Sequence, residues 1–204
     1  MITGNEDDPE LREAVAALQA GARSEVHSRR VFERFFPRVR RFFERLGYGV
    51  EDSEDLAQET LSRVFSQIGT LQSGDSFKSW VFAVAANLHR NQGRWRHREK
   101  RDAPEVSLDA TAEDGTPLHE PVAPEASPAR EAYEKERREA LARAVQVLPP
   151  QMGQVLSLRI GQDLKYREIA VVLQISIETV KAHLFQARQR LRSELGEAFG
   201  EWVE

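Results

Sequence analysis

One segment near the C-terminal end constrains the fold of this chain more than any other. Residues 166–184 read YREIAVVLQISIETVKAHL. Their apolar spacing predicts two short helices separated by Gln174-Ile175-Ser176, with the second helix continuing to Arg192. The positions spaced to bury one face of each helix against the other are Ile169, Ala170, Leu173, Ile175 and Val180. The pattern is typical of a helix-turn-helix and favours an all-α chain.

The outer face of the second predicted helix is free to enter the major groove of DNA. It carries Glu178, Thr179, Lys181, Ala182, Phe185 and Gln186. An ordinary helical hairpin with solvated charges is the alternative from this segment alone. The residues that precede this segment decide between a DNA-binding helix-turn-helix and an ordinary hairpin.

Charge is separated by sign along the chain, although the net charge of the 204 residues is only −4. Residues 78–101 hold seven basic side chains against one acid, and residues 165–192 hold six against two. Residues 102–128 hold seven acids and no Lys or Arg. Two basic, nucleic-acid-binding units joined by an acidic tether would produce this distribution.

Several classes of protein are excluded or disfavoured. With no cysteine, the chain has no disulfide, thiol nucleophile or Cys-ligated zinc. No apolar run approaches the about 20 residues that span a bilayer, and the N-terminus lacks a signal-peptide pattern, so we expect a cytoplasmic protein without membrane insertion. His89 and His97 stand apart from carboxylates at metal-ligand spacing, and no acid/base or nucleophile arrangement appears. We therefore expect no metal, no cofactor and no enzymatic activity.

Helical periodicity divides the chain into two small helical domains joined by a flexible, acidic, proline-rich linker. A first helical face repeats through Phe32, Phe35, Phe36, Val39, Phe42, Phe43 and Leu46. Pro37 within it is expected to kink the helix or to mark its start. Acids open a second helix near Glu51, and a third helix ends near Arg101. The predicted divisions are an N-terminal extension 1–25, a first domain 26–101, a linker 102–130, a second domain 131–197 and a tail 198–204.

Two sets of motifs resemble one family. Asp55-Leu-Ala-Gln-Glu-Thr, followed by Asp75-Ser-Phe-Lys-Ser-Trp and an Arg-rich helix end, is similar to region 2 of sigma-70-family initiation factors. Leu148-Pro-Pro-Gln, Tyr166-Arg-Glu-Ile-Ala and Thr179-Val-Lys are similar to region 4. Because only a short tether separates them, the chain resembles the extracytoplasmic-function group, which lacks the intervening domain.

The resemblance implies three sets of contact residues. The clamp helices of core RNA polymerase would dock on Asp55, Gln58, Glu59 and Arg63. The −10 element would be read by Lys78, Trp80, Asn87, Arg90, Arg94, Trp95 and Arg96, with Asn87 at the position that contacts an extruded base. Trp80 also falls on the apolar stripe, and core packing is its alternative role. The −35 element would be read by Glu178, Thr179, Lys181, Ala182, Phe185 and Gln186, with Arg188 serving phosphates or the polymerase flap.

Three positions depart from the family pattern. Lys165 stands where relatives usually place a Ser or Thr helix cap, so the first helix of the pair is expected to start differently. Gln186 stands where Arg is frequent, which should alter the −35 preference, and Gly153 replaces a common Arg.

The tether sets a geometric requirement. The resemblance implies two promoter elements about 17 base pairs apart, or roughly 58 Å at ~3.4 Å per pair. The tether of residues 102–128 can reach at most ~90 Å at ~3.3 Å per residue, so it can span the gap. Because it is a flexible coil, it cannot hold the two DNA-reading units at a fixed distance. Core RNA polymerase is thus the expected partner, together with promoter DNA and, by resemblance, an anti-sigma factor. A stand-alone helix-turn-helix transcriptional regulator is the alternative.

Overall fold

The computed structural model describes residues 8–22, 24–71, 76–102, 140, 143–145 and 147–196, with side chains of the fourth helix described up to residue 92. Within these ranges every regular element is a helix, which confirms the all-α prediction. Almost all of the predicted linker 102–130 and the tail 198–204 lie outside the described residues.

The first domain is built from α2 (Glu25–Arg45), α3 (Val50–Gln67), the short η1 (Ile68–Thr70) and α4 (Phe77–Asp102). Helix α1 (Pro9–Gln19), which lies in the predicted N-terminal extension 1–25, buries its apolar face in the same core and is part of this domain. The Asp8 carboxylate caps α1 by accepting from the Glu10 amide at 3.1 Å. The Gln19 side chain donates to the Leu71 carbonyl, so the N-terminal helix is fastened to the end of η1. Phe42 meets Phe82 edge to face at 5.7 Å between ring centroids, joining α2 to α4.

Helix α2 continues through Pro37 without a break. The expectation that Pro37 marks a helix start is wrong, because α2 begins at Glu25, well upstream. Buried side chains on both sides of the proline, Val31 and Phe35 before it and Val39 after it, hold the helix against its neighbours. Packing of this face offsets the hydrogen bond that proline cannot donate.

The second domain comprises α6 (Pro150–Leu156), a wider π-type turn η2 (Ser157–Gly161), α7 (Tyr166–Leu173) and α8 (Ile177–Leu195). The break between α7 and α8 falls at the predicted residues 174–176. Gln174 takes a left-handed conformation at φ 57°, and the Ser176 hydroxyl accepts from the Thr179 amide at 3.0 Å. The expectation that Lys165 changes where this helix starts is wrong, because α7 begins at Tyr166 with Lys165 as its N-cap. The Glu168 carboxylate accepts from the Lys165 amide and stabilises this start.

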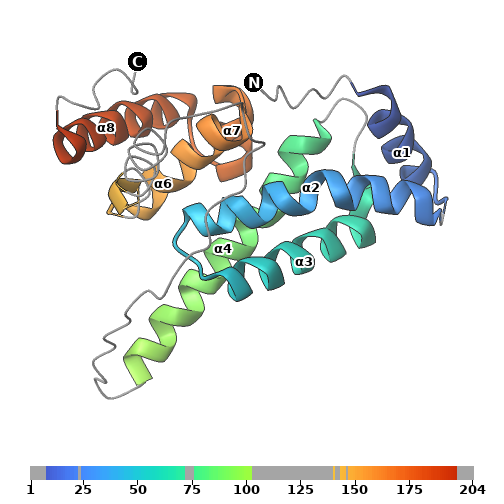
Figure 1. Cartoon of the computed structure of the whole chain (residues 1–204), viewed down its shortest axis with the longest axis horizontal. Coiled ribbons are helices and arrows are strands. Elements are labelled where there is room, and N and C mark those ends of the chain that lie inside the picture. Colours follow the sequence, from blue (N-terminus) through green and yellow to red (C-terminus); the bar gives the residue numbers. More distant parts are fainter. Residues whose placement is uncertain are drawn as a thin grey trace, which may run out of the picture.

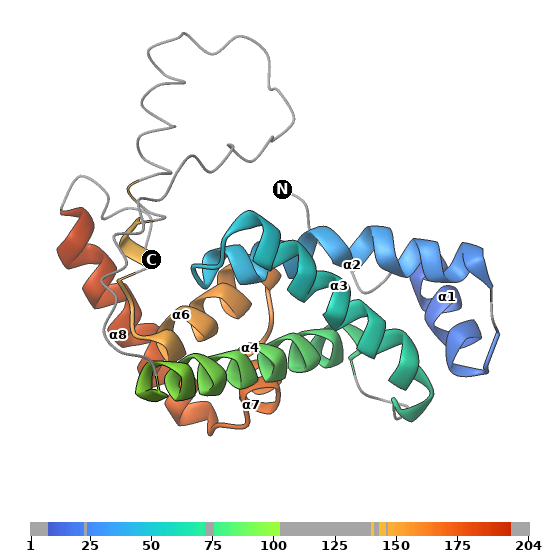
Figure 2. The same ribbon diagram turned by 90° about the horizontal axis from the view of Figure 1, so that it is seen from below.

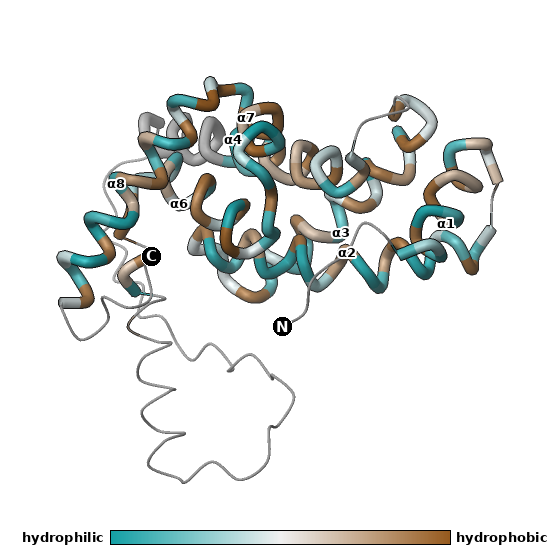
Figure 3. Tube along the Cα trace, turned by 90° about the horizontal axis from the view of Figure 1, so that it is seen from above, coloured by the Kyte–Doolittle hydropathy of each residue, from teal (hydrophilic) through white to brown (hydrophobic). Residues whose placement is uncertain are grey.

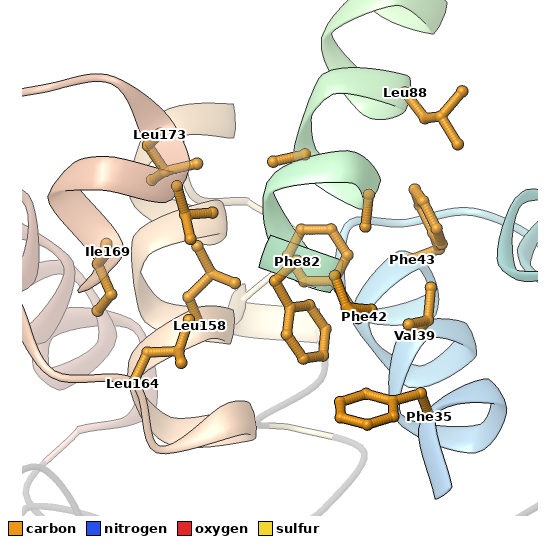
Figure 4. Close-up of a cluster of buried hydrophobic side chains, with 14 of the residues drawn as sticks. Phe35, Val39, Phe42, Phe43, Phe82, Leu88, Leu158, Leu164, Ile169 and Leu173 are labelled. Atoms are coloured by element: carbon orange, nitrogen blue, oxygen red, sulfur yellow. The ribbon is translucent and has the colours of Figure 1, made fainter. Parts of the chain in front are cut away.

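The two domains pack against each other. Helix α4 lies between α3 on one side and α7 on the other, as the views in Figure 1 and Figure 2 both show. In Figure 4, Phe42 and Phe82 of the first domain belong to the same buried cluster as Leu158, Leu164 and other residues of the second. The linker argument did not anticipate this contact, which brings the two predicted readers together.

Candidate nucleic-acid interface

The outer face of α8 is exposed, as the sequence predicted. Glu178, Lys181, Ala182, Phe185, Gln186 and Arg188 are all exposed. Phe185 leaves 63 % of its surface open, while Val180 and Leu184 on the opposite side are buried. Thr179 is half-buried, with its hydroxyl 2.9 Å from that of Ser176. Figure 3 shows the resulting alternation of hydrophilic and hydrophobic stretches along α8. Polar and cationic groups thus project beside one bulky apolar side chain.

Helix α3 presents the second predicted surface. Asp55, Gln58, Glu59 and Arg63 are all exposed. Leu56 and Leu61 are buried behind them, so the helix divides cleanly into a packed and a polar face. Arg63 pairs with Glu59 at 2.5 Å, one helical turn away. An ordered polar face of this kind can dock on another helix without exposing the core.

Helix α4 carries the third predicted set, and its residues differ in accessibility. Asn87 is exposed, whereas Arg90 and Trp80 are half-buried and Lys78 keeps only 8 % of its surface exposed. Trp80 packs beside Phe77 at 6.0 Å between ring centroids, which fits the core-packing alternative for this residue. The side chains of Arg94, Trp95 and Arg96 lie outside the described residues.

Arg90 joins the predicted −10 reader to the helix-turn-helix. One guanidinium nitrogen donates to the Asn87 side-chain oxygen at 2.9 Å, and the other donates to the Leu173 carbonyl at 3.4 Å. Leu173 is the last residue of α7, where helix carbonyls lack partners within their own helix. A cation at this end is also favoured by the helix dipole. Arg90 therefore caps α7, the first helix of the helix-turn-helix.

The two domains also contact each other between α2 and η2. The side-chain amide of Gln162, which is 2 % exposed, donates to the Arg38 carbonyl at 3.3 Å. At Gly161, an added Cβ would clash with the guanidinium of Arg45. Arg45 is exposed as a whole residue, but burial around its guanidinium lowers its pKa, the neighbouring Arg41 acts in the same direction, and Glu44 opposes them.

The sequence analysis did not predict the contact between the two domains, because none of the residues that form it belongs to a binding motif. One signal was present in the sequence of α4. Residues 80–86 are all apolar, so their side chains are spread around the whole circumference of the helix and not along a single stripe. A helix that is apolar on more than one side indicates partners on more than one side.

Other kinds of site find no support in the described part of the chain. No group of three or more His, Cys, Asp or Glu side chains there is arranged to hold a metal ion. Within the same residues, no helix combines the length and apolar character needed to cross a membrane.

Two family descriptions match the chain. The family described as Sigma-70 region 2 matches residues 31–102, and Sigma-70, region 4 matches residues 138–191. The chain is 26 % identical over 147 residues to the RNA polymerase sigma-H factor of Pseudomonas aeruginosa, covering 72 % of this chain and 75 % of that protein. It is 32 % identical over 169 residues to the ECF RNA polymerase sigma factor SigE of Mycolicibacterium smegmatis, covering 82 % of this chain and 61 % of that protein.

Solved structures show the same fold. The sigma factor RpoE from Bartonella quintana, in complex with the anti-sigma factor NepR, superposes with a TM-score of 0.62 at 22 % identity, over 82 % of this chain and 95 % of that chain. CnrH, in complex with the cytosolic domain of CnrY, superposes with a TM-score of 0.63 at 18 % identity, over 91 % and 97 %.

Proposed function

The chain belongs to the sigma-70 family of RNA polymerase initiation factors, in its extracytoplasmic-function group, and from this premise we propose that it reads a two-part promoter, the −10 element through α4 and the −35 element through α8. As a sigma factor it directs transcription initiation. The division of promoter reading between the two helices is the part that experiment must establish.

The observation that carries the −35 assignment is the exposed outer face of α8 on an intact helix-turn-helix. Lys181 and Gln186 offer donors to base edges, and Phe185 offers apolar contact to a thymine methyl group. Arg188 serves a phosphate or the polymerase flap. Because Gln replaces a frequent Arg at 186, we expect a −35 preference that differs from those of relatives with Arg.

The −10 assignment depends on α4. Asn87 is exposed and can hydrogen-bond the edge of an unpaired base, and Arg90 is the nearest described cation. Captured single-stranded bases favour the opened duplex, so α4 would both read the element and stabilise its opening. Arg94, Trp95 and Arg96 would extend this surface along the strand. Lys78 can join it only if its buried side chain becomes accessible.

Core polymerase would dock its clamp helices on the polar face of α3, and the flap would contact the second domain. The RpoE and CnrH structures hold their partners NepR and CnrY, and we propose that an anti-sigma factor likewise binds this chain. The protein would act in the cytoplasm, where promoter DNA and polymerase are found.

Run-off transcription with core polymerase is the direct test. Core enzyme alone and core enzyme with this protein are compared across a genomic promoter library. We expect new start sites that require the protein, each preceded by a shared pair of sequence elements. If no start site is gained, the proposal is wrong.

A gel-shift assay with the purified protein alone distinguishes a sigma factor from a stand-alone transcriptional regulator. The sigma assignment predicts weak binding to the same promoter duplexes without polymerase. Tight and selective binding by the isolated chain would favour the regulator instead.

A further inference from the structure

Helix α2 carries a row of arginines along one side, outside both candidate DNA-reading helices. We call this set the arginine row, and it consists of Arg30, Arg34, Arg38, Arg41 and Arg45. At 3.6 residues per turn, spacings of four, four, three and four place the whole row within about 80° of the helix circumference. No other residue between positions 30 and 45 falls in this arc, so no acid interrupts the row. At ~1.5 Å per residue it is about 22 Å long.

Much of the charge of the arginine row is not neutralised within the protein. In the part of the chain that the structure describes, no ion pair involves Arg34, Arg41 or Arg45. Arg30, at the N-terminal end of the row, pairs with Glu10 of α1 at 3.0 Å. Burial, and after it the charge of Arg41, lowers the pKa of Arg45. The row therefore keeps an excess of positive charge that attracts an anionic partner.

The arginine row lies on the side of α2 that is turned away from α3. Arg40, about 120° around the helix from the centre of the row, reaches Glu54 of α3 at 3.4 Å. The row instead meets α1 through Arg30, and its other end lies beside η2, where the Arg45 guanidinium approaches Gly161. Polymerase can therefore dock on the polar face of α3 without covering the row.

The phosphate backbone of DNA fits the arginine row better than a protein surface does. Protein interfaces place aromatic or other apolar anchors at their centre, and the exposed large apolar side chains of α2, Val26 and Phe32, lie outside the arc of the row. Guanidinium groups bind phosphates with two parallel hydrogen bonds. About 22 Å of duplex presents about six phosphates on each strand, so one strand offers a phosphate for every cation of the row.

We propose that the arginine row of α2 is a third DNA-contact surface, which holds backbone phosphates of the promoter duplex beside the −10 element. The proposal rests on the promoter-reading function proposed above. The position beside the −10 element follows from the packing of α2 on α4, which Phe42 and Phe82 join. Because phosphates carry no sequence information, the row contributes equally at every promoter, and its contribution falls as the salt concentration rises.

A photo-crosslinker on a unique thiol tests where the arginine row lies. The chain has no cysteine, so Arg41→Cys, at an exposed position of the row, can be labelled with an azidophenacyl group before core polymerase is added. Arg29→Cys, exposed on the same helix but outside the row, is the matched control. In the complex of holoenzyme and promoter, we expect crosslinks to DNA from position 41 and none from position 29. Absence of a DNA crosslink from position 41, with or without a crosslink to polymerase, overturns the proposal.

The salt dependence of DNA binding tests whether the arginine row contacts phosphates. The double variant Arg34→Gln/Arg41→Gln is compared, as holoenzyme, with Arg12→Gln/Arg29→Gln, which removes the same charge at exposed positions outside the row. Each phosphate contact that is lost lowers the slope of log K against log salt by about 0.9. The control should therefore outbind the row variant by about tenfold more at about 50 mM salt than at about 200 mM, on every promoter sequence.

Binding to core polymerase, measured by fluorescence anisotropy, should be the same for both variants. Equal salt slopes overturn the proposal, and so does a loss of core affinity in the row variant, which would mean that the row serves polymerase. If the unmodified holoenzyme binds promoter and non-promoter duplexes alike, the proposed function has failed, while the difference in salt slope still decides whether the row contacts phosphates.

Discussion

The two candidate DNA readers stand in opposite states. The outer face of α8 is exposed along its length, with Lys181, Phe185 and Gln186 all open to solvent. On α4, by contrast, Arg90 is tied to the second domain and Lys78 is buried. The difference follows from packing, since α8 buries one face and α4 buries two. If both helices read DNA as proposed, α8 can meet it as it lies, whereas α4 offers the exposed Asn87 but holds Arg90 against the second domain.

Because of this difference in packing, we expect DNA binding by α4 to cost more free energy than DNA binding by α8. If the two helices read DNA as proposed, reading by α8 requires only that DNA approach its outer face. Reading by α4 would disturb its contact with the second domain, which exposes apolar surface and leaves the carbonyl end of α7 without the Arg90 cap. On the proposal that α4 stabilises the opened duplex, promoter opening is the step expected to respond most strongly to substitution.

The largest expected effect is that of Asn87→Ala on promoter opening. If Asn87 holds an extruded base, its loss should reduce open-complex formation by up to about a hundredfold, since a good bidentate pair between an amide side chain and a base edge is worth about 1–3 kcal/mol. Permanganate reactivity of opened thymines measures opening, and fluorescence anisotropy measures core binding, which should not change. Asn91→Ala, the same substitution one turn along α4, is the control. Collapse of core affinity in the Asn87 variant would show that this face of α4 serves polymerase.

A smaller effect is expected at α8, where no contact has to break first. Gln186→Ala should weaken use of the preferred −35 sequence by about tenfold and relax the preference at one position, as loss of a contact to a base edge does. Selection from a randomised −35 library measures the change. Gln151→Ala, an exposed glutamine of α6 in the same domain, should leave the selected sequences unchanged. Uniform weakening across all sequences would mean that Gln186 positions the helix without reading a base.

Periodicity was enough to predict the elements and the exposed faces but not the contact between domains. The helix-turn-helix break at residues 174–176 and the inward direction of Val180 and Leu184 follow from spacing that is local in the chain. The contact between the two domains is formed by residues far apart in sequence, and the proximity of Gly161 to Arg45 cannot be predicted from the neighbours of either residue in the chain. Burial of Lys78 could not be predicted either, because a basic residue at a helix start is usually solvated.

Substitutions at two glycines test how strongly α4 and α2 hold the second domain. Gly161→Ala places a Cβ against the guanidinium of Arg45, an exposed side chain that can turn aside, so the open fraction should rise by no more than about fivefold, the equivalent of about 1 kcal/mol. Cysteines introduced at the exposed positions Asn91 and Val171 and bridged by a bis-maleimide report this fraction, because their rate of bridging falls as the domains part. Gly153→Ala in α6 meets no atom within 4 Å and should leave that rate unchanged while adding about 0.5–1 kcal/mol of helix stability. Equal bridging rates in the two variants would mean that Arg45 moves aside freely and that Gly161 has no part in the contact between the domains.

The smallest expected effect concerns the turn between α7 and α8. Gln174 holds a left-handed conformation at φ 57°, so Gln174→Gly should stabilise the protein by up to about 1 kcal/mol, raising the melting temperature by a few degrees. Asp163→Gly is the matched control at φ 51°, where a smaller gain is expected because Asp tolerates this region and its bond to Arg159 would be lost. The Leu173 carbonyl that accepts from Arg90 directly precedes Gln174. If the glycine variant gains stability and also bridges more slowly between 91 and 171, the turn that orients α8 also holds the domains together. If bridging is unchanged, the turn serves the −35 reader alone, and the contact between the domains depends on α4.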